Sequence, residues 1–177
     1  MEIAKIKQYT REMTLTSMFI ALGLIVPMIF HTFHLGGPIF LPMHLPVIMC
    51  GFLVGRKQGL LCGLIVPLLS SLLTGMPPLF PTAFVMSIEL GTYGFVTGWL
   101  GKKINVYGAL ILAQCIGRIT GAVASFILLG LASKPFILST YITSVFVTAL
   151  PGILLQLLLI PMGIIFLQRV GVIRKDG

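Results

Sequence analysis

Charged side chains are scarce in this chain, and acidic ones above all. Only four residues are acidic and twelve are Lys or Arg, so charged residues make up 9% of the 177 positions. A soluble domain carries about 25% charged residues because its surface faces water. Hydrophobic residues make up 57% of the sequence. The scarcity of charge excludes an ordinary water-soluble domain and predicts one domain whose main solvent is lipid.

Several catalytic motifs are also missing from the sequence. It has no glycine-rich phosphate loop ending in Lys-Ser/Thr, so we do not expect the chain itself to hydrolyse ATP. It also lacks G-x-S-x-G, HExxH and a carboxylate pair. Cys50, Cys62 and Cys115 lie inside apolar runs without the spacing of a disulfide framework or a zinc site. We therefore expect no enzyme, no cofactor and no metal.

Long apolar runs predict an all-α integral membrane protein with six transmembrane helices. A helix needs about 20 apolar residues to cross the hydrocarbon core. The predicted spans are 13–30, 39–55, 60–74, 81–100, 107–132 and 137–167. The second span is short and contains Pro42 and Pro46, so its first part is expected to be extended or loop-like. The first span is interpreted as retained, since no small-residue cleavage site follows it.

Basic residues cluster in the N-terminal segment, in two turns and in the C-terminal tail. They are Lys5, Lys7, Arg11, Arg56, Lys57, Lys102, Lys103, Arg169, Arg174 and Lys175. Six spans place these ten of the twelve basic residues on one side, and the positive-inside rule puts both termini in the cytoplasm. The net charge of +8 thus indicates topology in a multi-pass protein of the cell membrane and does not indicate nucleic-acid binding.

Two charged residues, Glu89 and Arg118, are predicted near the middle of the membrane. A charge at that depth is costly, faces the bundle interior and usually marks a functional site. One interpretation is an ion pair that only locks two helices together. The other is that one or both side chains line a polar cavity and contact a ligand. The two interpretations are compatible.

Further polar residues share these helix faces. Gln114 lies one turn before Arg118, and Tyr93 lies one turn after Glu89. Gln156 in the last span is another amide expected to be buried. Together these side chains predict a small polar pocket with apolar walls, which is the usual makeup of a small-ligand site.

Two apolar segments on the predicted outer side could cover such a pocket. Segment 31–44 contains His31, His34 and His44, whose spacing matches no metal-ligand pattern. It is expected to fold back onto the bundle like a lid. Segment 76–81 is a second rigid, proline-rich loop. The alternative is that both are plain interfacial loops resting on lipid.

Two stretches of sequence carry a resemblance to a known family. The first-helix segment TLTSMFIALGL is followed by an outer loop and then by FLPMHLPVIMCGFLVGRKQGLLCGLIVPLLSSLLTG. With the length, the six predicted spans and the basic profile, these segments resemble the substrate-binding membrane subunit (S-component) of an energy-coupling factor (ECF) vitamin transporter. The resemblance covers essentially the whole chain.

This resemblance implies a mechanism and partners. An S-component captures a vitamin-like solute from outside and topples against a transmembrane coupling subunit, which two ATP-binding-cassette ATPases drive. The family's A-x-x-x-A docking motif corresponds here to Ser17 and Ala21. The implied substrate-binding candidates are Glu89, Tyr93, Gln114, Arg118, His34 and His44.

Other functions remain open at this point. They are a standalone secondary transporter, a scaffold subunit stabilised by Glu89 and Arg118, and a small membrane enzyme that uses its histidines.

Overall fold

The computed structural model describes residues 2–33 and 37–170, and no β-strand occurs among them. The α-helices are α1 (Glu2–Thr32), α2 (Gly37–Phe40), α3 (His44–Val54), α4 (Arg56–Thr74), α5 (Phe84–Leu100), α6 (Val106–Leu131), α7 (Leu138–Ile142) and α8 (Leu150–Arg169). Two π-helical segments, η1 (Leu79–Ala83) and η2 (Thr143–Thr148), precede α5 and α8. The all-α prediction is confirmed.

Five helical segments are long and apolar enough to cross a membrane. They are Lys5–Thr32, Arg56–Thr74, Leu79–Leu100, Val106–Leu131 and Leu150–Arg169. The predicted second span is not one helix, because Leu41 has a positive φ of 51° and the following Pro42 disfavours a helical residue before it. The remaining helix α3 has 11 residues, about 16 Å at 1.5 Å per residue.

The predicted sixth span is also divided. Residues 138–148 form α7 and η2, and a new helix, α8, begins at Leu150 with Pro151 in its first turn. Proline is favoured there because the first helical N–H groups need no partner within the helix. Pro161 lies inside α8 and does not end it.

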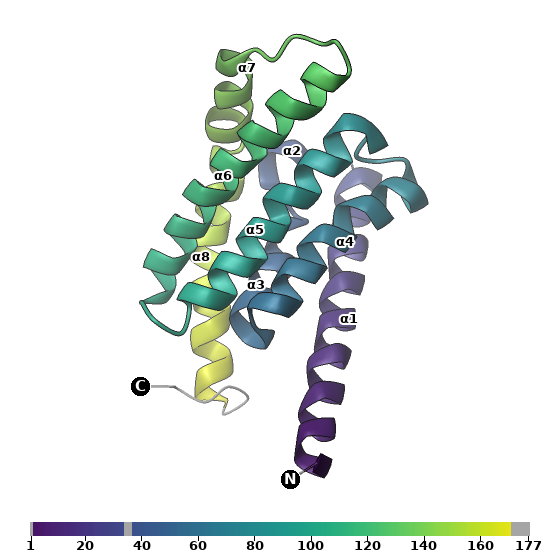
Figure 1. The fold of residues 1–177 in the computed structure, drawn as a ribbon. Helices are drawn as coiled ribbons and strands as arrows, with labels where there is room; N and C mark the ends of the chain where they lie inside the picture. Colours follow the sequence, from purple (N-terminus) through teal and green to yellow (C-terminus); the bar gives the residue numbers. More distant parts are fainter. Residues whose placement is uncertain (1, 34–36, 171–177) are drawn as a thin grey trace.

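Helix α5 is the centre of the bundle and packs against α3, α4 and α6 (Figure 1). Glycines allow the α4–α5 approach: a Cβ on Gly94 would overlap the backbone of Gly59, and one on Gly63 would overlap that of Leu90. Small residues on facing helices commonly let backbones pack this closely in membranes. Gly59, Gly63 and Gly94 therefore lie in this interface.

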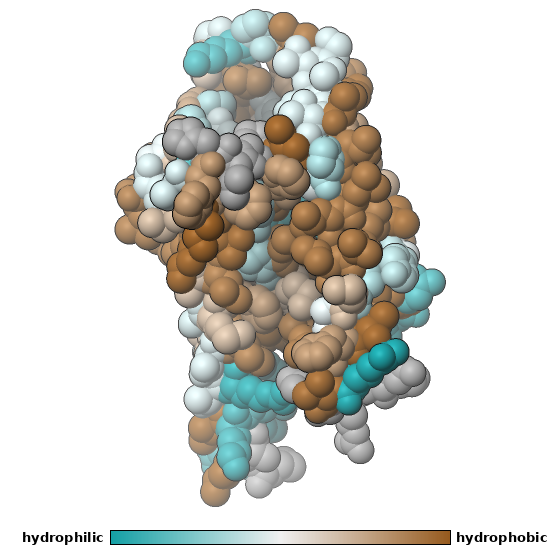
Figure 2. All heavy atoms as spheres, turned by 180° about the vertical axis from the view of Figure 1, so that it is seen from behind, coloured by the Kyte–Doolittle hydropathy of each residue, from teal (hydrophilic) through white to brown (hydrophobic). Residues whose placement is uncertain are grey.

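The basic turns, the N-terminal end of α1 and the C-terminal end of α8 lie at one end of the molecule. Figure 1 shows the start of α1, the α3–α4 turn, the α5–α6 turn and the end of α8 at its lower end. Lys103 lies over the ring of Trp99 there, with Nζ 4.7 Å from the ring centroid. Trp is enriched where a membrane meets water. Figure 2 shows hydrophilic side chains at this end, below a broad hydrophobic band.

The outward faces of the spanning-length helices are apolar. Leu22 of α1, Leu72 of α4, Ile119 of α6 and Leu158 of α8 are all exposed large hydrophobic residues. In water such a surface would be an aggregation hazard, whereas lipid tails solvate it. The structure is therefore that of a multi-pass membrane protein.

Candidate functional site

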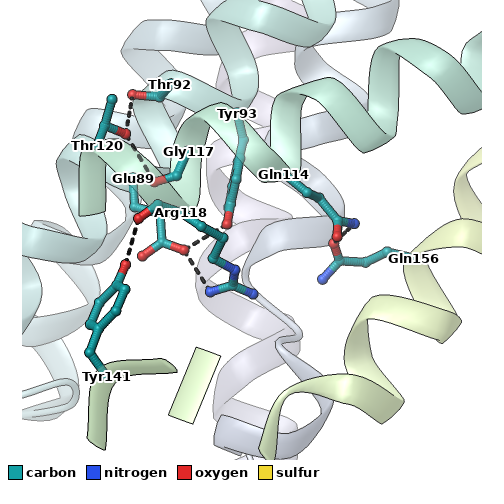
Figure 3. A network of polar contacts seen from close by, with 9 residues as sticks. All are labelled: Glu89, Thr92, Tyr93, Gln114, Gly117, Arg118, Thr120, Tyr141 and Gln156. Atoms are coloured by element: carbon teal, nitrogen blue, oxygen red, sulfur yellow. Dashed lines mark hydrogen bonds and ion pairs between the residues drawn. The ribbon is translucent and has the colours of Figure 1, made fainter. Parts of the chain in front are cut away.

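A buried ion pair between α5 and α6 is the centre of the candidate site. Arg118 Nη1 donates to Glu89 Oε1 at 2.7 Å (Figure 3). The two residues are 6% and 5% exposed. Glu89 lies ten residues after Leu79 and eleven before Leu100, the bounds of its apolar segment. Glu89 thus lies near the middle of an apolar segment of spanning length, and the two buried charges neutralise each other.

Two tyrosines hold the pair in place. Tyr93 Oη donates to the same Glu89 Oε1 at 2.6 Å, one helical turn away. Tyr141 Oη, from α7, donates to the backbone carbonyl of Arg118 at 2.8 Å. The Arg118 guanidinium also lies over the Tyr93 ring, 5.9 Å from its centroid. Residues from three segments therefore converge on one charged group.

Glycines of α6 provide the space for this cluster. A Cβ on Gly117 would overlap the Tyr93 ring. A Cβ on Gly121 would lie 2.8 Å from both Glu89 Oε2 and Tyr141 Oη, which is closer than real Cβ contacts. Gly117 and Gly121, one helical turn apart, thus accommodate polar side chains of the site.

Two amides extend the cluster toward α8. Gln114 Nε2 donates to Gln156 Oε1 at 3.1 Å, which links α6 to α8. Gln156 is 1% exposed. In Figure 3 the Arg118 side chain extends between Tyr141 and this pair of amides. Gln114, one helical turn before Arg118, and its partner Gln156 therefore lie on the α8 side of the charged centre.

Four buried polar atoms at this site lack hydrogen-bond partners among the described residues. They are Arg118 Nε, Gln156 Nε2 and both ring nitrogens of His44. His44, the first residue of α3, packs on Tyr93 with ring centroids 5.4 Å apart. Buried polar groups in native proteins nearly always have partners. Such a concentration within one cluster calls for a specific explanation.

The structure brings most of the sequence-predicted site residues together. Glu89, Tyr93, Gln114, Arg118 and His44 all belong to the cluster. His34 lies outside the described residues, so its proposed role stays a prediction. Sequence reasoning missed Tyr141, because it comes from the lead-in to the last helix and no spacing relates it to Arg118.

The two loops expected on the outer side differ from each other. Pro42, Met43 and His44 are buried, and α2 packs on α8, where a Cβ on Gly152 would lie 2.7 Å from the Ile39 carbonyl oxygen. The end of the first loop thus folds back onto the bundle as expected. The second loop is largely exposed, with Met76 among its exposed residues.

The fold and the site define a class: a multi-pass helical membrane protein with a buried polar centre and no metal-binding cluster of His, Cys, Asp or Glu in its described part. The family model of the ECF transporter substrate-specific component matches residues 11–164. The chain belongs to this family, whose members are substrate-binding transporter subunits and not enzymes. No curated protein and no solved structure gives a significant match.

Proposed function

We propose that this chain captures a vitamin-like small molecule in the cell membrane for an ATP-driven importer, and that the ligand binds at the Glu89–Arg118 cluster. Family membership supports the role of substrate-binding subunit. The single observation that supports this position is the set of four unpartnered buried polar atoms on Arg118, Gln156 and His44. A ligand that bonds to these atoms would remove a penalty of about 1–3 kcal/mol for each.

The donor pattern suggests the chemistry of the ligand. Arg118 Nε and Gln156 Nε2 can only donate hydrogen bonds, while neutral His44 offers one donor and one acceptor. Glu89 can accept from a ring N–H or an amine. A planar heterocycle with carbonyl or carboxylate oxygens and ring N–H groups would satisfy this set. Pterin-like, deazaguanine, pyrimidine and pyridine compounds have these features.

The proposal includes six membrane crossings with both termini in the cytoplasm. The α2–α3 unit would act as the second crossing, with its irregular part at residues 41–43 covered by protein. Burial of Pro42 and Met43 supports this, because irregular backbone at membrane depth must be shielded from lipid. The basic residues at one end of the bundle support the orientation.

The partners we propose are a transmembrane coupling subunit and two ATP-binding-cassette ATPases. Ser17 and Ala21 are both exposed on α1 and lie one turn apart, so they form a small-residue patch against which another helix could pack closely. Their exposure supports a docking role for this face.

A purely structural role for the ion pair is the second candidate, and one observation favours it. The 2.7 Å contact is complete without any ligand, so the pair also links α5 to α6. Under a purely structural role, the pair would hold the helices together, and any ligand that accompanies the protein would bind without contacting it.

The test is mass spectrometry of small molecules released from the purified, denatured protein, followed by a binding assay with the compound found. We expect a stoichiometric ligand, and Gln156→Leu should weaken its binding at least tenfold. Ser70→Ala removes a buried hydroxyl that bonds to the Met76 carbonyl outside the cluster and should leave affinity unchanged. Native affinity in a folded Gln156→Leu protein would show that the ligand does not bind at the cluster.

A further inference from the structure

A second site lies at the end of the bundle that carries the basic turns. A cavity of about 640 Å³ is bordered by α1, α3, the α5–α6 turn, α6 and α8. Its volume falls in the range of about 300–1,000 Å³ that small-molecule sites occupy. None of its lining residues belongs to the Glu89–Arg118 cluster, so it is a separate feature of the molecule.

The polar part of this cavity is cationic. Lys7, Arg11 and Lys102 line it, and all three are exposed. Within residues 2–33 and 37–170, the Glu89–Arg118 pair is the single salt bridge, so these cations have no carboxylate within bonding distance there.

The cavity's own acidic residue is already engaged. Glu12 accepts hydrogen bonds from Gln8 at 3.0 Å and from Gln58 at 2.7 Å. Both carboxylate oxygens therefore have amide donors. Three basic groups line the cavity, and the Glu12 carboxylate beside them already accepts two hydrogen bonds. The cavity therefore favours an anionic ligand.

The remaining walls of the cavity are apolar. Leu15 of α1, Phe52 of α3, Val106 of α6 and Ile164 of α8 supply them. A free inorganic anion would gain nothing from such walls, whereas an acyl chain would be solvated by them. The nearby interfacial Trp99 carries Lys103 over its ring, which places the cavity at the level where lipid headgroups lie.

We propose that this cavity binds one anionic phospholipid. Its phosphate contacts Arg11, Lys7 and Lys102, and the part of an acyl chain nearest the headgroup lies along the apolar walls. Arginine suits a phosphate because its guanidinium can donate two parallel hydrogen bonds. Basic pockets between membrane helices on the cytoplasmic side are known to bind anionic headgroups. The lipid would bridge α1 to α8 at the end of the bundle where these helices border the cavity.

The experiment measures lipid binding to the delipidated full-length protein in detergent by native mass spectrometry. Dioleoyl-phosphatidylglycerol and dioleoyl-phosphatidylcholine are titrated separately, which compares anionic and neutral headgroups on the same chains. We expect phosphatidylglycerol to bind at least tenfold more tightly, with one high-affinity molecule per chain. Equal affinity for the two lipids would overturn the proposal.

Matched variants locate the site. Lys102→Gln should weaken phosphatidylglycerol binding about fivefold, which is about 1 kcal/mol at about 1.4 kcal/mol per tenfold. Its neighbour Lys103→Gln removes the same charge from the same turn but not from the cavity, and should have no effect. Arg11→Gln and Lys5→Gln form a second such pair on α1. Equal effects within both pairs would show nonspecific attraction and contradict the site.

Two further outcomes distinguish other occupants. If inorganic phosphate at low millimolar concentration displaced phosphatidylglycerol from the native protein, the site would be a general anion site and the lipid proposal would fail. If Arg11→Gln left lipid binding unchanged but abolished association with a protein partner, the cavity would be a protein-docking site. We expect neither result.

Discussion

Gly121 of α6 leaves the space that the Glu89 carboxylate of α5 occupies. A Cβ at this position would lie 2.8 Å from Glu89 Oε2 and equally close to Tyr141 Oη. The glycine therefore controls how closely the acid and the tyrosine approach Arg118. This relationship makes the arrangement of the site testable without removing any of its polar groups.

Gly121→Ala should displace the Glu89 carboxylate and weaken ligand binding about tenfold, because binding groups must keep their geometry within about half an ångström. The matched control is Gly130→Ala in the same helix, where an added Cβ meets nothing within 4 Å. Isothermal titration with the ligand released from the native protein would measure both variants. Unchanged affinity in a folded Gly121→Ala protein would mean that ligand contacts lie elsewhere.

Breaking the ion pair should separate its structural from its binding contribution. Arg118→Met leaves Glu89 buried without its partner, and such a change typically destabilises by about 3–5 kcal/mol. The double variant Glu89→Leu/Arg118→Met removes both charges and should recover most of the melting temperature of the native protein in detergent.

The ligand-binding function predicts a different result for the same double variant in a binding assay. It should be folded yet bind the native ligand at least a hundredfold more weakly, because the guanidinium donors are gone. A pair with a purely structural role predicts native affinity once stability is restored. A thermal melt and a titration of one protein preparation therefore distinguish the two.

The buried pair itself was predictable from sequence because charges in apolar runs are rare and must find partners. Glu89 and Arg118 were the acidic and the basic residue deep inside predicted spans, so the cost of an unpaired charge made an ion pair one of the two interpretations of the sequence. Tyr93 followed from helical spacing. Tyr141 did not, since its approach depends on how residues 138–148 fold over α6 before α8 begins.

The helix count was less predictable because proline and backbone geometry, and not hydropathy, decide it. Residues 39–55 are apolar enough for a span, yet the turn at Leu41 leaves only α3 as a sustained helix. Hydropathy measures the preference for lipid and cannot show whether the backbone continues as one helix. The cavity bordered by α1 and α8 could not be predicted from the sequence either, because it depends on how distant segments pack.

The α4–α5 interface predicts a steep loss of stability on a small substitution. A Cβ on Gly94 would overlap the backbone of Gly59, which cannot move aside as a side chain can. Gly94→Ala should therefore destabilise by at least the 1–3 kcal/mol typical of overpacking. Gly163→Ala is the control, because its Cβ would meet only the flexible end of Met49 at 3.4 Å.

The melting temperature of each purified variant in detergent would measure this difference. We expect a large decrease for Gly94→Ala and a change near zero for Gly163→Ala. Similar melting temperatures would indicate that α4 and α5 pack less closely than the structure shows.

The orientation of the bundle can be tested by labelling single cysteines. In a background with Cys50, Cys62 and Cys115 replaced by alanine, cysteine is introduced at Lys57, at Lys103 or at Lys134. Six crossings with cytoplasmic termini place the first two positions inside the cell and the third outside, since the turns containing Lys57 and Lys103 lie at the same end of the bundle. A membrane-impermeant maleimide on intact cells should therefore label only the Lys134→Cys protein, while permeabilised cells should show labelling at all three positions. Labelling of both Lys57→Cys and Lys103→Cys but not Lys134→Cys in intact cells would make α3 a re-entrant segment that returns to its side of entry, because α4 and α5 both cross between the first two positions. The basic residues at the start of α1 would then no longer share a face with these two turns.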